Sequence, residues 1–376
     1  MIDSEFKNKI GQMIMVGFKE AELEKDSPVV RAIKDFSLGG VILYNIDLKC
    51  YLGEQKKNPS LTRYEAARLC PRNIISLDQL KNLTSILQSY SKNRLLIGVD
   101  EEGGLVSRLG PAAGFPETES PKALGEKNDL AITAKAAKTT ARDLRQSGIN
   151  FNLAPVVDLN LNPEGPISRN GRSFGSDPNL VYRHAIAFIL AHRQQGIPTT
   201  LKHFPGKGSA KEDTHFQMAE VTSSYQPQEL YPFSWLIEEG LADAVMTSHI
   251  LHRDWDAEYP ITLSPKILRG FLREELGFQG VIISDDLLMG AIVNRFGLEE
   301  ACWLAVEAGI DILLASNNSP EGYDSDLFMR MFEALIKGVE QGRISRSMIE
   351  ASYPRIMALK NRMSKKKIIM GNINDS

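Results

Sequence analysis

The 376-residue sequence has little of what marks several classes of protein. Its formal net charge is −3 at pH 7, so it lacks the excess of basic residues that nucleic-acid-binding proteins usually carry. No apolar run approaches the roughly 20 residues that span a membrane, and residues 1–18 lack the basic stretch and apolar core of a secretory signal. We therefore expect neither a nucleic-acid nor a membrane partner and predict the cytoplasm, although a chain trimmed of its signal would look the same and would be periplasmic or exported.

Cysteine is scarce as well. The three cysteines, Cys50, Cys70 and Cys302, do not have the spacing of metal ligands. Their odd number argues against a full disulfide framework, so we expect reduced thiols. We predict no metal and no cofactor, and the sequence does not indicate the oligomeric state.

Short apolar runs alternate with amphipathic segments through most of the sequence, which is typical of strand-helix units around a parallel sheet. Eight runs are expected to be strands, namely 13–18, 41–44, 95–99, 150–153, 199–202, 244–247, 281–283 and 310–314. Eight such units predict an α/β fold, a single (β/α)8 barrel over residues 1–363 with some irregular strands. We expect residues 364–376 to be a solvated tail and predict no second domain.

One segment, 46–72, departs from this alternation. It is polar, has no clear hydrophobic period and carries Lys56, Lys57, Asn58 and Pro59 near its middle. We predict an inserted loop here, and a lid is one interpretation of it.

Polar residues fall at the C-terminal ends of five expected strands. They are Asp100, Asp158, Lys202 with His203, His249, and Asp285 with Asp286. In a (β/α)8 barrel this rim is the face that carries the active site. The sequence therefore predicts a functional site at the rim.

The carboxylates at the rim have different expected roles. Asp285 is the first carboxylate after its apolar strand and should point into the barrel mouth, so we predict that it is the reactive one. Asp286 is interpreted as a structural neighbour, because Asp readily accepts bonds from nearby backbone amides. Asp158 is expected to be a structural partner of a neighbouring loop.

The basic residues at the rim leave alternatives open. Lys202 could form a Schiff base, as in barrel aldolases, but with His203 beside it and a carboxylate across the mouth it suits hydrogen bonds to hydroxyl groups better. His249 is as readily a packed imidazole as a substrate contact.

A loop after the fifth expected strand carries Asp213 and His215. A carboxylate can hold an imidazole in one tautomer and raise its basicity, which makes a general acid/base near neutral pH. The alternative is an incidental pair on a polar surface loop.

The order of several motifs resembles that of the bacterial β-N-acetylglucosaminidases of glycoside hydrolase family 3, over nearly the whole chain. The matching motifs are Asp100-x-Glu-Gly-Gly-x-Val-x-Arg108, Asn152-x-Ala-Pro-Val-x-Asp158, Gly171-Arg172-Ser173-Phe174-Gly175, Lys202-His203-Phe204-Pro205-Gly206, Asp213-Thr214-His215, Thr262-Leu263-Ser264 and Ser284-Asp285-Asp286-Leu287. The resemblance implies a retaining exo-β-N-acetylglucosaminidase that acts on terminal β-linked N-acetylglucosamine, and its usual setting is the turnover of peptidoglycan fragments.

The resemblance also implies a role for each site residue. Asp285 matches the nucleophile that forms a covalent glycosyl-enzyme, and His215, oriented by Asp213, matches the acid/base. The residues that match ligands of the terminal sugar are Asp100, Arg108, Arg172, Lys202 and His203.

Two positions depart from the family pattern. Lys207 stands where the family usually has a second histidine, and Leu105 stands where an arginine is common. Two alternatives to the implied activity are a β-glucosidase of the same family and a non-catalytic sugar-binding barrel in which Lys207 marks a decayed site. A neutral acid/base repels anions less than a carboxylate does, so phosphate in place of water as acceptor is a minor hypothesis.

Two further expectations concern the loops near the rim. The loop that carries His215 is long enough that it could need to close over the substrate. Segment 46–72, near the same rim, could alter which leaving group fits.

Overall fold

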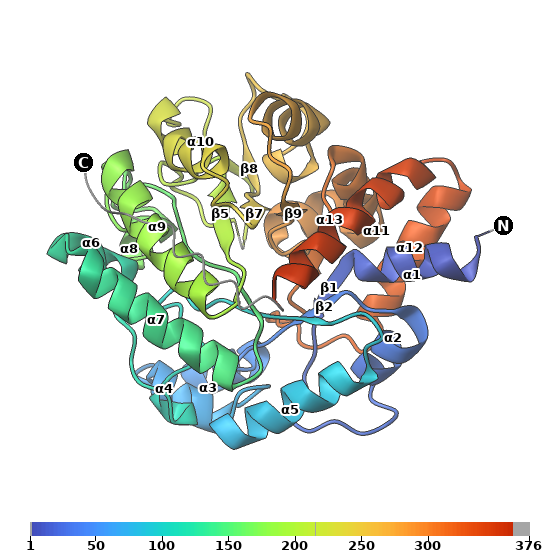
Figure 1. Cartoon of the computed structure of the whole chain (residues 1–376), viewed down its shortest axis with the longest axis horizontal. Coiled ribbons are helices and arrows are strands. Elements are labelled where there is room, and N and C mark those ends of the chain that lie inside the picture. The colour runs from blue at the N-terminus through green and yellow to red at the C-terminus, as the bar shows by residue number, and fades with distance from the viewer. Residues whose placement is uncertain (1, 215, 364–376) are drawn as a thin grey trace.

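The computed structural model of the chain describes residues 2–214 and 216–363. Short parallel strands form the centre of the molecule, and helices surround them (Figure 1). The strands of the central ring are β1 (Ile14–Gly17), β2 (Gly40–Ile42), β3 (Leu96–Val99), β4 (Phe151–Asn152), β5 (Thr200–Phe204), β7 (Ala244–Thr247), β9 (Val281–Ile283) and β10 (Leu313–Ala315).

Two hydrogen-bonded sheets make up this ring. Strands β10, β1, β2, β3 and β4 form the first, and β5, β7 and β9 form the second. Isolated parallel bridges join the two sheets, Asn152 to Thr199 and Val156 to Lys202 at one junction and Ile283 to Ile312 at the other. The predicted single (β/α)8 barrel with irregular strands is therefore confirmed, and isolated bridges replace the continuous ladder at the two junctions. A separate parallel pair, β6 (Ala219–Glu220) with β8 (Ile250–Leu251), lies outside the ring.

The helices alternate with the strands as expected. The helices that surround the ring are α2 (Pro28–Phe36), α5 (Leu77–Tyr90), α7 (Leu130–Gln146), α9 (Pro178–Gln194), the π-helix η4 (Lys266–Glu275), α11 (Gly290–Ala308), α12 (Leu327–Glu340) and α13 (Arg346–Arg362). Further helices are α1 (Ser4–Gln12), α6 (Pro121–Lys127), α8 (Pro166–Arg169), α10 (Tyr231–Glu238) and the 3-10 turns η1 (Pro111–Ala113), η2 (Pro227–Leu230) and η3 (Ile261–Leu263).

Local sequence explains where the long helices begin. The Asp129 side chain accepts hydrogen bonds from the amides of Ala131 and Ile132 at the start of α7, and Ser76 accepts one from Gln79 at the start of α5. The first helix, α1, packs against the last two, α12 and α13, so the two ends of the described chain meet beside the ring (Figure 1). No helix among the described residues is both long and apolar enough to cross a membrane.

The prediction for segment 46–72 was wrong in its local structure. Two helices occupy it, α3 (Leu48–Lys57) and α4 (Arg63–Leu69), although α3 buries none of its residues and α4 buries only Ala66. Helices with so little buried surface show no hydrophobic period, which is why the sequence pattern did not reveal them. Their N-terminal caps stabilise them instead. Asp47 accepts a hydrogen bond from the Cys50 amide at the start of α3, and Thr62 and Glu65 form a capping box at the start of α4.

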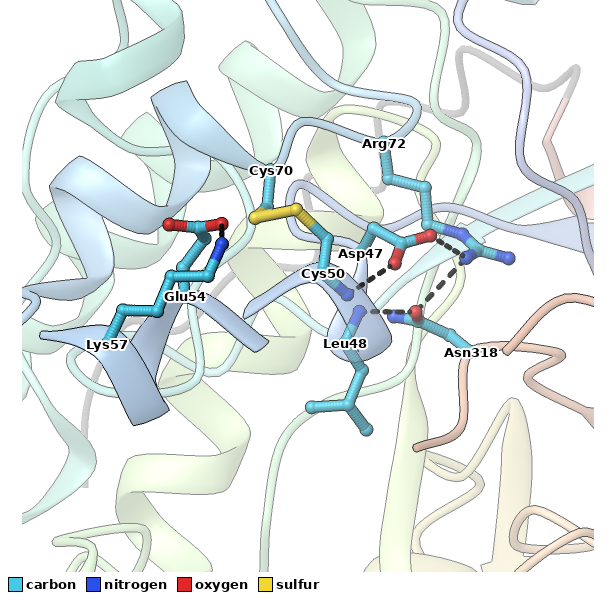
Figure 2. Close-up of a disulfide and its surroundings, with 8 residues drawn as sticks. All are labelled: Asp47, Leu48, Cys50, Glu54, Lys57, Cys70, Arg72 and Asn318. Atoms are coloured by element: carbon cyan, nitrogen blue, oxygen red, sulfur yellow. Dashed lines mark hydrogen bonds and ion pairs between the residues drawn. A yellow bond between two sulfur atoms is a disulfide. The ribbon is translucent and has the colours of Figure 1, made fainter. Parts of the chain in front are cut away.

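The expectation of reduced thiols was also wrong for two of the three cysteines. Cys50 at the start of α3 and Cys70 after α4 form a disulfide (Figure 2). An odd count excludes complete pairing but not one disulfide with one cysteine left over. Cys302 on α11 is that free cysteine, and burial raises the pKa of its thiol to about 12.

The disulfide predicts a local effect on stability. In Cys50→Ser with Cys70→Ser, opening of 48–69 should become easier by up to roughly 3 kcal/mol, because a cross-link over about 20 residues restricts the opened segment. Hydrogen exchange followed by mass spectrometry should show faster exchange in 48–69 and unchanged exchange in the ring strands. The matched control, Cys302→Ala, removes a thiol without breaking the cross-link and should leave exchange in 48–69 unchanged. Faster exchange throughout the ring in the double variant would contradict a local role.

Candidate functional site

A cavity of about 400 Å³ opens at the C-terminal ends of the ring strands. Six of the eight site residues expected from the sequence line it, namely Asp100, Arg108, Arg172, Lys202, His203 and Asp285. Asp213 is not among the lining residues, and His215 lies outside the described residues. The structure therefore brings together residues that are up to 185 positions apart, from Asp100 to Asp285.

Lys202 is the central cation of the cavity wall. Its side chain rises from β5, almost fully buried, and its ammonium lies 2.7 Å from Asp100 Oδ1 and 2.7 Å from Glu102 Oε1. Burial disfavours the charge, but the two carboxylates outweigh it and the pKa of Lys202 is raised. A Schiff-base lysine must lose its proton to attack a carbonyl, so this environment disfavours that alternative.

Glu102 is the functional-site residue that the sequence analysis did not single out. It binds the Arg172 guanidinium at two points, 2.8 Å to Nε and 2.7 Å to Nη2, in addition to Lys202. Burial alone would raise the pKa of Glu102, but Arg172 and Lys202 outweigh it and hold the pKa at about 2. A signal was present, because side chains two positions apart on extended backbone share a face, and Glu102 stands two residues after Asp100.

His203 is oriented by a buried carboxylate. Its Nδ1 lies 2.7 Å from Asp158 Oδ2, and its Nε2 lies 3.4 Å from Arg172 Nη2. Asp158 also accepts hydrogen bonds from the backbone amides of His203 at 3.1 Å and Lys207 at 3.0 Å. The prediction that Asp158 is a structural partner of a neighbouring loop is confirmed. Burial raises its pKa to about 6, against the opposing effect of Lys207 and the two amides.

Asp285 meets Lys207 at the cavity. The Lys207 ammonium lies 3.6 Å from Asp285 Oδ2, and the Lys207 side chain is only 6% exposed. Burial lowers the pKa of Lys207, and Asp285 opposes that shift. The residue that departs from the family pattern thus belongs to the site itself.

The neighbours of Asp285 hold the chain in place. Asp286 Oδ1 accepts from the amides of Leu288 and Ser316, each at 3.0 Å, which confirms its predicted structural role. His249 is fully buried, with Nδ1 2.8 Å from Thr262 Oγ1 and Nε2 2.9 Å from the Asp286 carbonyl oxygen. Since His249 does not line the cavity, the packed-imidazole alternative is the one that the structure supports.

The first half of the loop after β5 is anchored by another residue that the sequence analysis missed, Glu229. Its buried carboxylate accepts hydrogen bonds from the amides of Gly208 at 2.7 Å and Ser209 at 3.2 Å. A side chain at Gly208 would place its Cβ 1.9 Å from the Leu159 carbonyl oxygen, so only glycine fits there. The second half includes Asp213, and its pairing with His215 stays a prediction because His215 is outside the described residues.

Positive and negative side chains in nearly equal number line the cavity. This arrangement offers many hydrogen-bond donors and acceptors at little net charge, which suits a neutral ligand rich in hydroxyl groups. Within residues 2–214 and 216–363, no group of three or more His, Cys, Asp or Glu side chains is placed to hold a metal ion.

Comparison with known proteins gives a consistent set of matches. The family model "Glycosyl hydrolase family 3 N terminal domain" matches residues 5–359. A β-hexosaminidase A of Pseudoalteromonas piscicida is 31% identical over 358 residues, covering 85% of this chain and 60% of that protein. An uncharacterized secreted glycosyl hydrolase of Arthroderma benhamiae is 30% identical over 295 residues, covering 77% of this chain and 80% of that protein.

Solved structures agree with these matches. A glycoside hydrolase family 3 β-N-acetylglucosaminidase from Paenibacillus sp. str. FPU-7 superposes with a TM-score of 0.82 at 33% identity, covering 95% of this chain and 62% of that one. A β-N-acetylhexosaminidase from Beutenbergia cavernae superposes with a TM-score of 0.79 at 27% identity, covering 96% of this chain and 100% of that one. The chain thus spans about three fifths of the Pseudoalteromonas and Paenibacillus proteins.

The buried ion pairs predict how Glu102→Gln behaves with pH. The pKa of Glu102 is about 2 in the folded chain against an ordinary value of 4.5, so its ionised form stabilises the fold by roughly 3 kcal/mol above pH 4.5. That contribution is lost as the pH falls from 4.5 towards 2. Urea unfolding should therefore show a large loss of stability in the variant at pH 7 and a much smaller loss at pH 3.

The control for this measurement is Glu126→Gln on α6. Glu126 makes an exposed pair with Lys122, so its loss should change stability by less than about 0.5 kcal/mol at either pH. A Glu102→Gln variant whose loss is the same at both pH values would show that charge is not what Glu102 contributes.

Proposed function

The chain belongs to glycosyl hydrolase family 3, matching its N-terminal domain, and on that premise we propose that it is a retaining exo-β-N-acetylglucosaminidase. Its substrate is a glycoside with terminal β-linked N-acetylglucosamine. The observation that carries this proposal is that Asp285 lines the same cavity as the five residues expected to bind the sugar. The names of the relatives, β-hexosaminidase and β-N-acetylglucosaminidase, support an N-acetylated sugar over glucose.

The proposed reaction has two steps. Asp285 attacks the anomeric carbon to form a covalent glycosyl-enzyme, while an acid donates a proton to the leaving oxygen. Water then releases the sugar with the same group acting as base. We assign the acid/base role to His215, oriented by Asp213. That assignment rests on the sequence motif.

The cavity wall supplies the polar contacts that such a sugar needs. Lys202 and Arg172 present donors, Asp100 and Glu102 hold those donors in place, and His203 presents Nε2. Arg108 lies 3.7 Å from Asp100 and stacks over the Tyr44 ring at 5.4 Å. A substrate that lacks a bonded hydroxyl leaves such groups unpaired, so discrimination should be strong.

The contacts of Lys207 support an active enzyme over a non-catalytic sugar-binding barrel. Its ammonium compensates the charge of Asp285, and its backbone amide donates a hydrogen bond to Asp158. The substitution therefore leaves a complete set of charge partners at the site.

The sequence left two compartments open, the cytoplasm and an exported location. Disulfides persist mainly in oxidising surroundings, and Cys50 with Cys70 forms one. Together with the similarity to a glycosyl hydrolase named as secreted, this supports the periplasm or the cell exterior. We propose that compartment in place of the cytoplasm, and a role in the turnover of peptidoglycan fragments stays a prediction.

The first test is a panel of chromogenic β-glycosides. The N-acetylglucosaminide should be cleaved at least ~100-fold more efficiently than the glucoside, measured as kcat/KM, because the polar contacts of the cavity are matched to one sugar. A higher rate on the glucoside would replace the proposal with a β-glucosidase. Binding of N-acetylglucosamine without turnover would indicate a sugar-binding barrel.

The roles of Asp285 and His215 can be separated by leaving group. Asp285→Asn should abolish turnover of every substrate. His215→Ala should lower kcat/KM, which reports the first step, by roughly 10²- to 10⁴-fold for methylumbelliferyl N-acetylglucosaminide and spare kcat/KM for the dinitrophenyl glycoside, whose leaving group needs no proton. The exposed neighbour variant Lys211→Ala is the control and should keep the rates of the unaltered chain. An equal loss on both substrates would refute the acid/base role.

A further inference from the structure

A second cavity of about 380 Å³ lies beside the first. Five residues line both cavities, namely Asn45, Ile46, Arg63, Leu105 and Arg108. The far side of the second cavity comes from α4 and from the chain between Gly104 and Thr118. The two cavities are therefore neighbours with a common boundary at the barrel rim.

The second cavity lies on the side of the first from which the rest of a substrate would extend. The buried charges around Lys202 and Asp285 lie at the strand ends, and the proposed function places the terminal sugar against them. An exo-acting enzyme must let the remainder of its substrate leave towards the rim. The shared boundary, with Arg63 of α4 and Leu105, is at that rim.

The lining of the second cavity has the chemistry of a sugar-binding surface. Tyr64 is 42% exposed and Leu105 is 41% exposed, and with Pro111 they offer apolar surface for the C–H face of a pyranose ring. Arg63 donates one hydrogen bond to the Leu105 carbonyl oxygen at 2.6 Å. Its guanidinium carries further N–H donors that can bond a sugar hydroxyl. Ser107 adds a hydroxyl to the lining.

The Tyr64 ring has a fixed neighbour. The Arg68 guanidinium lies over it, 4.6 Å from the ring centre, from one turn further along α4. This contact orients the ring without covering it, since the side chain is among the most exposed large apolar ones of the described residues.

One disulfide and several hydrogen bonds, more than apolar packing, hold the wall that carries Arg63 and Tyr64. The Cys50–Cys70 disulfide joins the two ends of segment 50–70, and Arg72 bonds Asp47 at 3.2 Å and Asn318 at 3.1 Å (Figure 2). Asn318 also accepts from the Leu48 amide at 2.9 Å. These ties connect α3 and α4, which follow β2, to the chain after β10, a strand of the same sheet.

From these observations we propose that the second cavity is the subsite for the leaving-group sugar, with Arg63 and Tyr64 as its contacts and the disulfide-linked segment 50–70 as its wall. The ligand class is a second pyranose linked to the terminal one. This inference rests on the proposed function. It makes segment 46–72 a specificity element of the enzyme.

The test compares two substrates that share an alcohol leaving group and differ only in its size. N,N′-diacetylchitobiose would fill both cavities, whereas methyl β-N-acetylglucosaminide would fill only the first. In Tyr64→Ala, whose residue lines only the second cavity, kcat/KM for the disaccharide should fall roughly 10-fold, and kcat/KM for the methyl glycoside should change less than ~2-fold. Cys50→Ser with Cys70→Ser should show the same selective fall.

Lys57→Ala is the matched control. Lys57 is on α3 in the same segment, pairs with Glu54 at 2.8 Å and lines neither cavity, so both substrates should be cleaved as by the unaltered chain (Figure 2). An equal fall on both substrates in Tyr64→Ala, or no fall on the disaccharide, would overturn the subsite.

Failure of the proposed function would look different. If the unaltered chain cleaves neither substrate, that function is wrong, and the subsite is then tested by binding. Calorimetry on Asp285→Asn, with and without Tyr64→Ala, should show a loss of affinity of roughly 10-fold for the disaccharide and little change for the methyl glycoside. Equal affinities of the two proteins for the disaccharide would refute the subsite without reference to turnover.

Discussion

One buried ammonium between two carboxylates, one buried and one at the cavity surface, is the interaction on which the cavity depends. Removing each ion from water costs several kcal/mol, and only close and complete pairing offsets that cost. Lys202 meets this condition through Asp100 and Glu102, and Glu102 is in turn held by Arg172. Displacing Glu102 would leave the Arg172 guanidinium without this partner and Lys202 with one carboxylate in place of two. The part of the cavity that would hold the terminal sugar is therefore rigid before any ligand arrives, which is what precise recognition of hydroxyl groups requires.

A second set of buried charges lies at the opposite end of the ring and has a different consequence. Asp311, which precedes β10, is fully buried and pairs with Arg273 and Arg355. Lys360 of α13 donates to Gln12 and to the Gly39 carbonyl oxygen, and burial lowers its pKa to about 7. These groups tie the outer helices to the strand starts. The same residue types thus serve stability at one end of a barrel and a site at the other, so position along the strand carries the information.

Residue order along the chain predicted much of the fold and of the site, because both follow from periodic patterns. Eight apolar runs gave eight strands, and the polar residues after them met in one cavity. The acidic run after β3 shows where this reasoning ends. Asp100 binds Lys202, Glu101 accepts from the amides of Arg108 and Leu109, and Glu102 binds Arg172. Their alternating directions could have been anticipated from extended backbone, but their partners are distant in sequence.

The part of the fold that the sequence could not predict, segment 46–72, is held by a disulfide and individual hydrogen bonds. The helices α3 and α4 bury almost no apolar residue, so they have no periodic signal, and their positions depend on one disulfide and a few hydrogen bonds to Arg72 and Asn318. The two sides of the barrel mouth therefore differ in kind. The buried charges around Lys202 form one side, and the disulfide-linked helices α3 and α4 form the other. Because segment 46–72 contributes little to the core, its residues can change without destabilising the barrel, whereas the charges around Lys202 cannot. A fold divided in this way can keep one terminal sugar and adapt to many leaving groups.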